Sequence, residues 1–256
     1  MGQALVREIA VTNGAELAGG LERAGAPQLG QDPGLLAGIG ETGLKIVDDP
    51  AKLFTNVDAV IDFSIPACVA HHAALAAQAK AAYICGITGL ETAHLEDIRK
   101  CSHHTVIVQS YNMSMGVNLM AGLVRQMAAT LGEDWDIEIV EMHHRMKVDA
   151  PSGTAIMFGE AAAMGRGVPL EKVSDRGRDG ITGARQKGNI GFAALRGGQV
   201  IGEHTVIFAA DNERIEITHK AADRAMFAKG AVRAAMWAKG KPSGLYRMAD
   251  VLGLSG

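Results

Sequence analysis

Two adjacent histidines, an arginine and a lysine lie within five positions of one another in EMHHRMKVDAPSGTA, residues 141–155. Histidine titrates near neutral pH, so His143 or His144 is a candidate general acid. Ser-Gly-Thr then precedes an apolar run that predicts a helix, and a helix start offers N–H donors and a positive dipole end to a carboxylate. The stretch indicates a proton donor beside an anion pocket, with Arg145 and Lys147 as nearby cations. A solvated basic loop before a capped helix is the alternative that the residue types leave open.

Two other kinds of site fit these residues less well. Of nine histidines, six form adjacent pairs at 71–72, 103–104 and 143–144. Neighbouring side chains point to different sides of a helix or strand, so such a pair rarely holds one ion, and no HExxH or HxH motif occurs. Ser152 lies in PSGTA rather than GxSxG, which favours a helix cap over a nucleophile. We therefore expect no metal and no catalytic serine.

The composition is that of a soluble globular protein of one large or two modest domains. Of the 256 residues, 21% are charged and 48% apolar, and the net charge is -3. Nothing in this balance indicates a nucleic-acid or membrane partner. No apolar run approaches the roughly 20 residues of a membrane span, and the start has no signal-peptide core. Cys68, Cys85 and Cys101 are odd in number and lack CxxC spacing, which favours reduced thiols in the cytoplasm.

The first half of the chain alternates between strand and helix patterns. Short apolar runs predict strands at 15–22, 43–49, 58–63, 81–86 and 105–110. Helical patterns occupy 2–11, 66–80 and 90–101, and a glycine-rich loop is expected over 26–42. Strands that alternate with helices predict an α/β fold with a Rossmann-like, doubly wound parallel sheet. Such sheets bind ligands beyond the carboxyl ends of their strands.

From about residue 115 the pattern changes to a second, α+β unit. We expect a helix over 115–132, strands at 135–144, 189–196, 199–210 and 214–221, and a final helix over 225–240. Gly197-Gly198 and Asp211-Asn212 are typical hairpin turns, so the sheet should be mixed or antiparallel. We expect residues 1–114 and 225–256 to form a dinucleotide-binding domain. Residues 115–224 should form the substrate-binding and oligomerisation domain.

Two short segments of the first half are candidates for cofactor contacts. Gly86 to Gly89 (GITG) follows a predicted strand at its carboxyl end, where glycines let a cofactor approach the main chain, although GxxG alone is usually a turn. Glu22 and Arg23 end the first predicted strand. An acidic residue there can bind a ribose 2′-hydroxyl and an arginine a 2′-phosphate. Having both leaves NADH and NADPH open, and a surface ion pair is the alternative.

Several motifs, in order along the chain, resemble the dihydrodipicolinate reductase family of lysine and diaminopimelate biosynthesis. The signature is HHRMKVDAPSGTA, and the resemblance extends to LERAG (21–25), VIDFS (60–64), GITG (86–89), YNMSMGVN (111–118) and the segments 182–209 and 213–237. The family implies reduction of a cyclic imine dicarboxylate by hydride from NADH or NADPH. It also implies a homotetramer built by the sheet of the second domain.

The resemblance also implies roles for individual residues. His143 would be the general acid, Lys147 the paired catalytic cation or second proton source, and His144, Gly153 and Thr154 would hold a substrate carboxylate. The cofactor contacts would be Met1, Glu22, Arg23, Phe63, Gly86, Thr88, Ser110, Tyr111, Asn112, Met113, Arg224 and Phe227. No metal is implied.

The sequence departs from the family pattern at two places. A first strand and a GxxGxMG loop precede the first helix in the family, whereas Met1-Gly2 here runs straight into that helix. We expect a start assigned too late rather than a real truncation, because the family motif contains an internal Met. Ile65 stands where relatives often carry Arg. The competing hypotheses are a tetrameric remnant with poor cofactor binding, a same-fold reductase of another imine or carbonyl acid, and a metal hydrolase.

Overall fold

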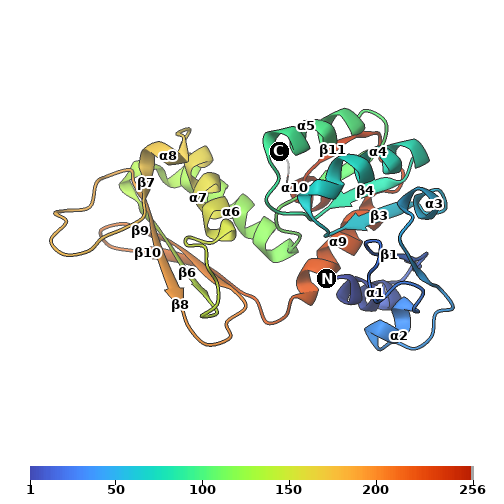
Figure 1. Cartoon of the computed structure of the whole chain (residues 1–256). Helices are drawn as coiled ribbons and strands as arrows, with labels where there is room; N and C mark the ends of the chain where they lie inside the picture. Colours follow the sequence, from blue (N-terminus) through green and yellow to red (C-terminus); the bar gives the residue numbers. More distant parts are fainter. Residues whose placement is uncertain (255–256) are drawn as a thin grey trace. The chain divides into compact units, whose positions relative to one another are not determined.

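The computed structural model describes residues 1–254, which form two compact units. The first unit comprises Met1–Met115 and the chain from Arg224 onward, and the second is Gly116–Asp223. Both combine helices with strands, as the chain colours in Figure 1 show.

The first unit is built on a four-stranded parallel sheet in the order β11-β5-β4-β3. Its strands are β3 (Ala59–Asp62), β4 (Ala82–Cys85), β5 (Val106–Gln109) and β11 (Gly244–Tyr246). The helices are α1 (Gly2–Val11), α2 (Pro33–Ala37), α3 (Pro50–Phe54), α4 (Val69–Ala79), α5 (Thr92–Cys101), α9 (Ala225–Ala238) and α10 (Met248–Val251), with a 3-10 turn η1 (Pro66–Cys68). The predicted helices and the three predicted strands β3 to β5 are confirmed, whereas α2, α3, α10 and β11 were not predicted.

Helices cover both faces of this sheet, so it is doubly wound. Ala82 and Ile84 of β4 belong to a core cluster with residues of α1 and α9, whereas Tyr83 and Cys85 pack in a second cluster with residues of α4 and α5. All four residues of β4 are buried. A strand buried on both faces reads as a continuous apolar run rather than an alternating one, which is why AAYICG was recognisable.

The first two predicted strands are much shorter than expected. β1 is Gly20–Leu21 and β2 is Ile46–Val47, and the two pair in parallel as a separate two-stranded sheet. The predicted loop over 26–42 contains α2, which Asp32 caps by accepting hydrogen bonds from Gly34 N and Leu35 N. This short helix was not predicted because the segment is rich in glycine, which is typical of loops. Asp32 also accepts hydrogen bonds from Thr42, so the same carboxylate closes the loop.

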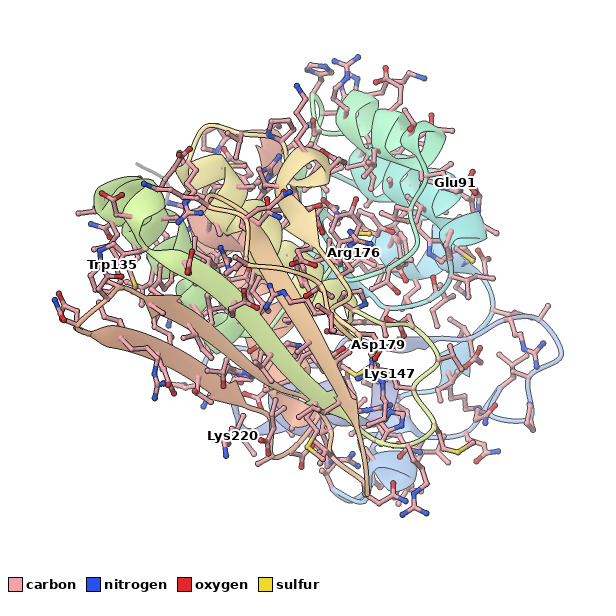
Figure 2. The ribbon with its side chains drawn as sticks, turned by 90° about the vertical axis from the view of Figure 1, so that its left-hand side faces the viewer. Glu91, Trp135, Lys147, Arg176, Asp179 and Lys220 are labelled. Carbon is pink, nitrogen blue, oxygen red and sulfur yellow. The ribbon has the colours of Figure 1, made fainter. Side chains whose placement is uncertain are left out.

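The second unit is a five-stranded mixed sheet in the order β10-β9-β6-β8-β7. Its strands are β6 (Asp136–His143), β7 (Ser174–Asp175), β8 (Ile190–Arg196), β9 (Glu203–Ala209) and β10 (Arg214–Lys220). The helices are α6 (Met115–Leu131), α7 (Gly153–Gly165) and α8 (Leu170–Val173), with a 3-10 turn η2 (Gly132–Asp134). Apolar residues of α6 and α7 pack on one face of this sheet in a single core cluster. Figure 2 labels Trp135, just before β6 begins, and Lys220, where β10 ends.

One of the two predicted hairpins is wrong. β8 and β9 are not neighbours, because β6 lies between them and pairs in parallel with β8 and antiparallel with β9. Gly197-Gly198 therefore begins a connection across β6 rather than a two-residue turn. The second hairpin is confirmed, since β9 and β10 pair antiparallel, with Arg214 opposite Ala209. A local turn signal cannot reveal that a strand from earlier in the chain has entered between two consecutive ones.

Candidate active site

His143 lies at the end of β6, on the face that packs against the helices. Residues of β6 alternate between half-buried and buried, and Glu141 and His143 are both on the buried side. His143 Nδ1 lies 2.6 Å from Glu141 Oε2, and the Glu141 side chain is only 1% exposed. His144 is the first residue after β6 and is half-buried, so the adjacent histidines lie in different environments.

The start of α7 lies against the same carboxylate. Ser152 N donates to Glu141 Oε1 at 3.0 Å, and Ser152 Oγ accepts from Ala155 N at 3.2 Å. The predicted helix start and its serine cap are therefore confirmed. Gly153 is the first helical residue, and a Cβ added to it would meet nothing within 4 Å. The structure leaves open space at the first turn of this 13-residue helix.

Two further cationic or titratable side chains complete the cluster. Arg196, opposite His143 on β8, donates to both oxygens of Glu141 at 2.7 and 2.9 Å. His204, opposite Glu141 on β9, lies edge-on to His143 with ring centroids 5.1 Å apart, and its Nε2 is 3.0 Å from Ser152 Oγ. Side chains from β6 and β8 and the start of α7 therefore meet at one buried carboxylate, and His204 from β9 lies beside His143 and Ser152.

Lys147 comes from the loop after β6 and is labelled in Figure 2. Its Nζ forms an ion pair with Asp149, at 2.7 and 2.9 Å from the two carboxylate oxygens. Its side chain is 19% exposed, so this ammonium group is partly enclosed. The positive charge of Lys147 acts to lower the pKa of both His143 and His204. Lys147 thus shares the electrostatic environment of the histidine pair.

Burial and charge shift the pKa values of this cluster in different directions. Burial acts to raise the pKa of Glu141, but hydrogen bonds from Arg196, His143 and Ser152 outweigh it and leave the pKa below its usual range. Burial lowers the pKa of His143 against the opposing effect of Glu141. Burial also lowers the pKa of His204 to about 4, so this ring is neutral at pH 7. The site holds an ionised carboxylate and two imidazoles whose pKa values are lowered by burial.

In the first unit, the carboxyl ends of β3, β4 and β5 bring several predicted cofactor residues together. Asp62 is opposite Cys85, and Cys85 is opposite Gln109, so Phe63, Gly86 and Ser110 follow directly after aligned positions. Gly86 N donates to Asp62 O at 2.9 Å and Ser110 N to Cys85 O at 3.1 Å. A Cβ on Gly86 would lie only 2.5 Å from Phe63 Cε1. The glycine at this position is therefore required for the ring to lie where it does.

The segments after these strands are held in defined turns. Ser110 Oγ donates to Asn112 O at 2.7 Å, and Asn112 Oδ1 accepts from Ser114 N at 2.9 Å. Thr88 and Tyr111 are exposed at this edge. Phe63, Met113 and Phe227 belong to or pack against one apolar cluster, which places helix α9 beside the strand ends.

The remaining predicted cofactor residues, Glu22, Arg23, Arg224 and Met1, lie outside these strand ends in the sequence of the first unit. Glu22 and Arg23 follow β1, in the separate two-stranded sheet, where Glu22 Oε1 accepts from Arg23 N at 2.9 Å. Arg224 is the exposed residue before α9. Met1 precedes α1, whose first turn has no side-chain cap. The long strand predicted to end at Glu22 is short, because Ala15 to Gly19 do not pair.

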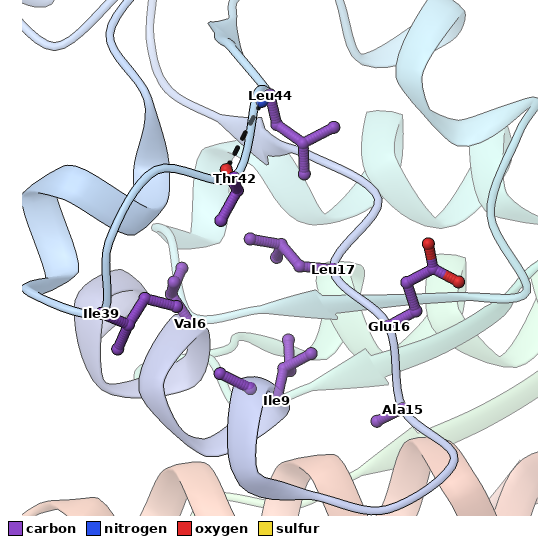
Figure 3. Close-up of a pocket in the computed structure, with 9 residues that line it drawn as sticks. Val6, Ile9, Ala15, Glu16, Leu17, Ile39, Thr42 and Leu44 are labelled. Atoms are coloured by element: carbon purple, nitrogen blue, oxygen red, sulfur yellow. Dashed lines mark hydrogen bonds between the residues drawn. The ribbon is translucent and has the colours of Figure 1, made fainter.

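A separate pocket of about 380 Å³ lies in the first unit beside α1. Figure 3 shows its mostly apolar lining, with Val6 and Ile9 from α1, Leu17 before β1, and Leu44 before β2. None of the predicted site residues lines it. We assign this pocket no part in the site.

Residues 1–254 contain neither a metal-ligand cluster nor a membrane-spanning helix. No group of three or more His, Cys, Asp or Glu side chains has an arrangement that could hold a metal ion. No helix in this part of the chain is long and apolar enough to cross a membrane. All three cysteines are free thiols.

The sequence interpretation missed Glu141, Arg196 and His204. One signal for Glu141 was present, since a residue two positions before His143 on a strand shares its face. Arg196 and His204 lie 53 and 61 residues beyond His143, and only the strand order β9-β6-β8 places them beside it. No local pattern marked either residue.

Comparison with known proteins covers nearly the whole chain. Residues 1–113 match the family described as "Dihydrodipicolinate reductase, N-terminus", and residues 116–252 match "Dihydrodipicolinate reductase, C-terminus". The 4-hydroxy-tetrahydrodipicolinate reductase of Parvibaculum lavamentivorans is 58% identical over 99% of this chain and 94% of its own length. That of Methylocella silvestris is 56% identical over 99% and 93%.

The fold agrees with these matches. The dipicolinate-bound dihydrodipicolinate reductase from Paenisporosarcina sp. TG-14 superposes with a TM-score of 0.76 over 97% of this chain and 94% of its own, at 21% identity. This likeness supports the α/β architecture with a Rossmann-like parallel sheet and a second, mixed-sheet unit. The two family matches together span both units, and the chain belongs to the dihydrodipicolinate reductase family.

Proposed function

We propose that this chain reduces 4-hydroxy-tetrahydrodipicolinate to tetrahydrodipicolinate with a nicotinamide cofactor, as the names of its relatives indicate. The observation that carries the proposal is the buried His143–Glu141 pair beside the open start of α7. A proton donor and an anion-binding helix start are what the reduction of a cyclic imine dicarboxylate requires. The chain-long identity with reductases supports the same reaction, and neither a remnant nor a metal hydrolase is favoured.

We propose that the substrate lies against the second unit through one of its carboxylates. The N–H groups of Gly153 and Thr154 head α7, where the helix dipole favours an anion. His144 and Lys147 add positive charge after β6. The Paenisporosarcina relative is described as binding dipicolinate, a cyclic dicarboxylate, which supports this class of substrate.

His143 then supplies the proton that the ring takes up once it has received hydride. Because Nδ1 faces Glu141, the opposite nitrogen Nε2 is the atom left to exchange a proton with the substrate. Lys147 is the second candidate source, and it also balances the negative charge of a dicarboxylate. General acids of this kind contribute about 10²- to 10⁴-fold to a rate.

The first unit offers residues that fit a dinucleotide. The uncapped N-terminus of α1, with open space at Gly2, suits a pyrophosphate, and the strand ends at Phe63 and Gly86 leave an exposed edge for the nicotinamide half. Thr88 and the 110–113 turn extend this edge. The bound cofactor would supply the hydride. We assign residues 1–114 and 225–256 to cofactor binding and 115–224 to substrate binding.

The choice between the two cofactors rests on Glu22 and Arg23. A carboxylate suits the 2′-hydroxyl of NADH and a guanidinium the 2′-phosphate of NADPH, so we propose that the chain accepts either. Arg224 and Phe227 are proposed to line the same site from the start of α9. A homotetramer, as the family resemblance implies, remains part of the proposal.

The test is turnover of freshly prepared 4-hydroxy-tetrahydrodipicolinate, followed by loss of reduced-nicotinamide absorbance. His143→Ala and Lys147→Ala should each lower kcat about 10²-fold or more while leaving the Kd for NADH near that of the wild type. His103→Ala, an exposed histidine from another adjacent pair, is the matched control and should retain full activity. Near-normal turnover by His143→Ala across pH would refute the assignment of the proton donor. Preference for a monocarboxylate would refute the substrate.

A further inference from the structure

We propose that Glu141 is the positioning residue of this site: its buried carboxylate holds the His143 ring in one tautomer and orientation and joins it to the start of α7. The inference rests on the proposed function of His143 as proton donor. We further propose that the Glu141 carboxylate fixes the position of the proton donor relative to the anion site, because it contacts both.

The first support is the contact between the two side chains. The 2.6 Å separation of Glu141 Oε2 and His143 Nδ1 is short, as expected for a charge-assisted hydrogen bond. Both side chains are at least nine-tenths buried. An ionised carboxylate can only accept, so Nδ1 must carry the proton. Nε2 is therefore the nitrogen that gains or loses a proton during the reaction.

The second support is that Glu141 itself has little freedom. Its two oxygens accept from the two terminal nitrogens of Arg196 in bidentate geometry, which fixes the plane of the carboxylate. Arg196 in turn donates to the carbonyl oxygen of Asp149, in the loop that carries Lys147. A carboxylate held from three directions can impose an orientation on the imidazole that it contacts.

The third support is the space around Nε2. A Cβ on Gly202 would lie 3.0 Å from His143 Nε2, so the glycine keeps that nitrogen clear of the neighbouring strand. The neutral His204 ring packs edge-on against His143, with ring centroids 5.1 Å apart. The charged or titratable groups that face His143 are thus Glu141, Arg196, Lys147 and His204.

The fourth support is the link to the anion site. Glu141 Oε1 accepts from Ser152 N, one residue before Gly153 begins α7. Since one carboxylate group contacts both His143 and this backbone N–H, a shift of Glu141 would move the proton donor and the carboxylate pocket together. Misplacement by about 1 Å can lower a rate about 10²-fold.

The first experiment reads the tautomer directly, in the wild-type protein without substrate. Nitrogen-15 NMR of the histidine side chains, with His143→Gln to assign the signals, should show Nδ1 protonated and hydrogen-bonded in His143. In Glu141→Gln the charge-assisted hydrogen bond is lost, so the nitrogen-15 chemical shift of His143 Nδ1 should differ from that of the wild type. Protonation of Nε2 alone in the neutral wild-type ring would overturn the inference, even if the reductase activity is confirmed.

The second experiment is kinetic. Glu141→Gln should lower kcat about 10²-fold or more and leave the Kd for NADH within about twofold, and its pH profile should move to lower pH because the carboxylate no longer favours the imidazolium. Glu141→Asp keeps the charge, so its profile should stay close to the wild type. Glu138→Gln is the matched control, because Glu138 is on the same strand, faces the other way and pairs with Arg178 and Arg185.

The outcomes separate this inference from the proposed function. If the wild type turns over the dicarboxylate but Glu141→Gln and Glu138→Gln lose activity equally with unchanged pH profiles, Glu141 has only a structural role. If Glu141→Gln keeps kcat within about threefold of the wild type, positioning is also refuted. If the wild type itself fails to reduce the substrate, the proposed function fails, whereas the NMR result still tests the tautomer.

Discussion

Replacing Gly86 by alanine should test the proposed cofactor edge through a single steric contact. The backbone of Gly86 does not occupy the left-handed region, so alanine introduces no conformational strain of that kind. The added Cβ would lie 2.5, 2.7 and 2.9 Å from Cε1, Cζ and Cδ1 of Phe63. The three nearest atoms to the added Cβ thus all belong to the Phe63 ring.

The size of the effect follows from these distances. Carbon atoms in contact prefer about 3.5–4.0 Å, so the ring must move by about 1 Å or more. Overpacking of this kind typically costs about 1–3 kcal/mol. If half of that strain is relieved only when the cofactor leaves, the Kd for NADH and NADPH rises about 2- to 13-fold. The free energy of unfolding should also fall, by no more than about 3 kcal/mol.

The assay is fluorescence titration of both reduced cofactors into four proteins: wild type, Gly86→Ala, Phe63→Ala and the double variant. Gly86→Ala should weaken binding much less in the Phe63→Ala background, because the clashing ring is gone. Gly177→Ala, whose Cβ would meet nothing within 4 Å, is the control and should bind normally. Equal weakening in both backgrounds would refute the steric explanation. Unchanged binding in every variant would show that this edge does not hold the cofactor.

Three further outcomes are expected. Because a bound dianion favours the imidazolium of His143, the basic limb of kcat should lie at higher pH than that of kcat/KM; coincident limbs would argue against His143 as the titrating acid. Tyr83→Phe removes a fully buried 2.8 Å hydrogen bond to Asp62 and should lower the free energy of unfolding by about 1.5–3 kcal/mol in urea titrations. That loss should diminish as pH falls through the lowered pKa of Asp62, and a pH-independent loss would contradict the ionised partner. Desolvation acts to raise the pKa of Asp32, but hydrogen bonds from Thr42, Leu35 and Gly34 outweigh it and lower the pKa to about 2. Asp32→Asn should therefore destabilise the protein above about pH 4, and the difference should vanish as pH falls through the pKa of Asp32. Thermal melts at several pH values check this.

Much of the fold was predictable where the signal is local. Short, continuous apolar runs became β3, β4 and β5, and the inner strands β4 and β5 are almost fully buried because helices cover both faces of the parallel sheet. The start of α7 was predictable from Ser152, whose side chain caps the helix as its type suggests. The different environments of His143, which is buried, and His144, which is half-buried, agree with the expectation that adjacent side chains point to different sides.

Predictions that depended on pairing between distant segments succeeded less well. The stretch from 15 to 22 was predicted as one strand, but only Gly20–Leu21 finds a partner, because a strand forms where another backbone is available to pair with it. The turn at Gly197-Gly198 has hairpin chemistry, yet β6 occupies the place beside β8. The residue types of a segment indicate which local conformations it can adopt. Which strand pairs with which depends on the other strands that can occupy the same edge of the sheet.

The sequence alone therefore determined the residue types at the site: a histidine able to donate a proton, a lysine nearby, and a helix start suited to a carboxylate. The tertiary structure decided which partners tune them. Because β8 and β9 flank β6, Arg196 reaches the buried Glu141 carboxylate and His204 lies beside His143. Hydrogen bonding and burial act over a few ångströms in space, and 50 or more residues of chain separate these groups, so no spacing in the sequence encodes their contact.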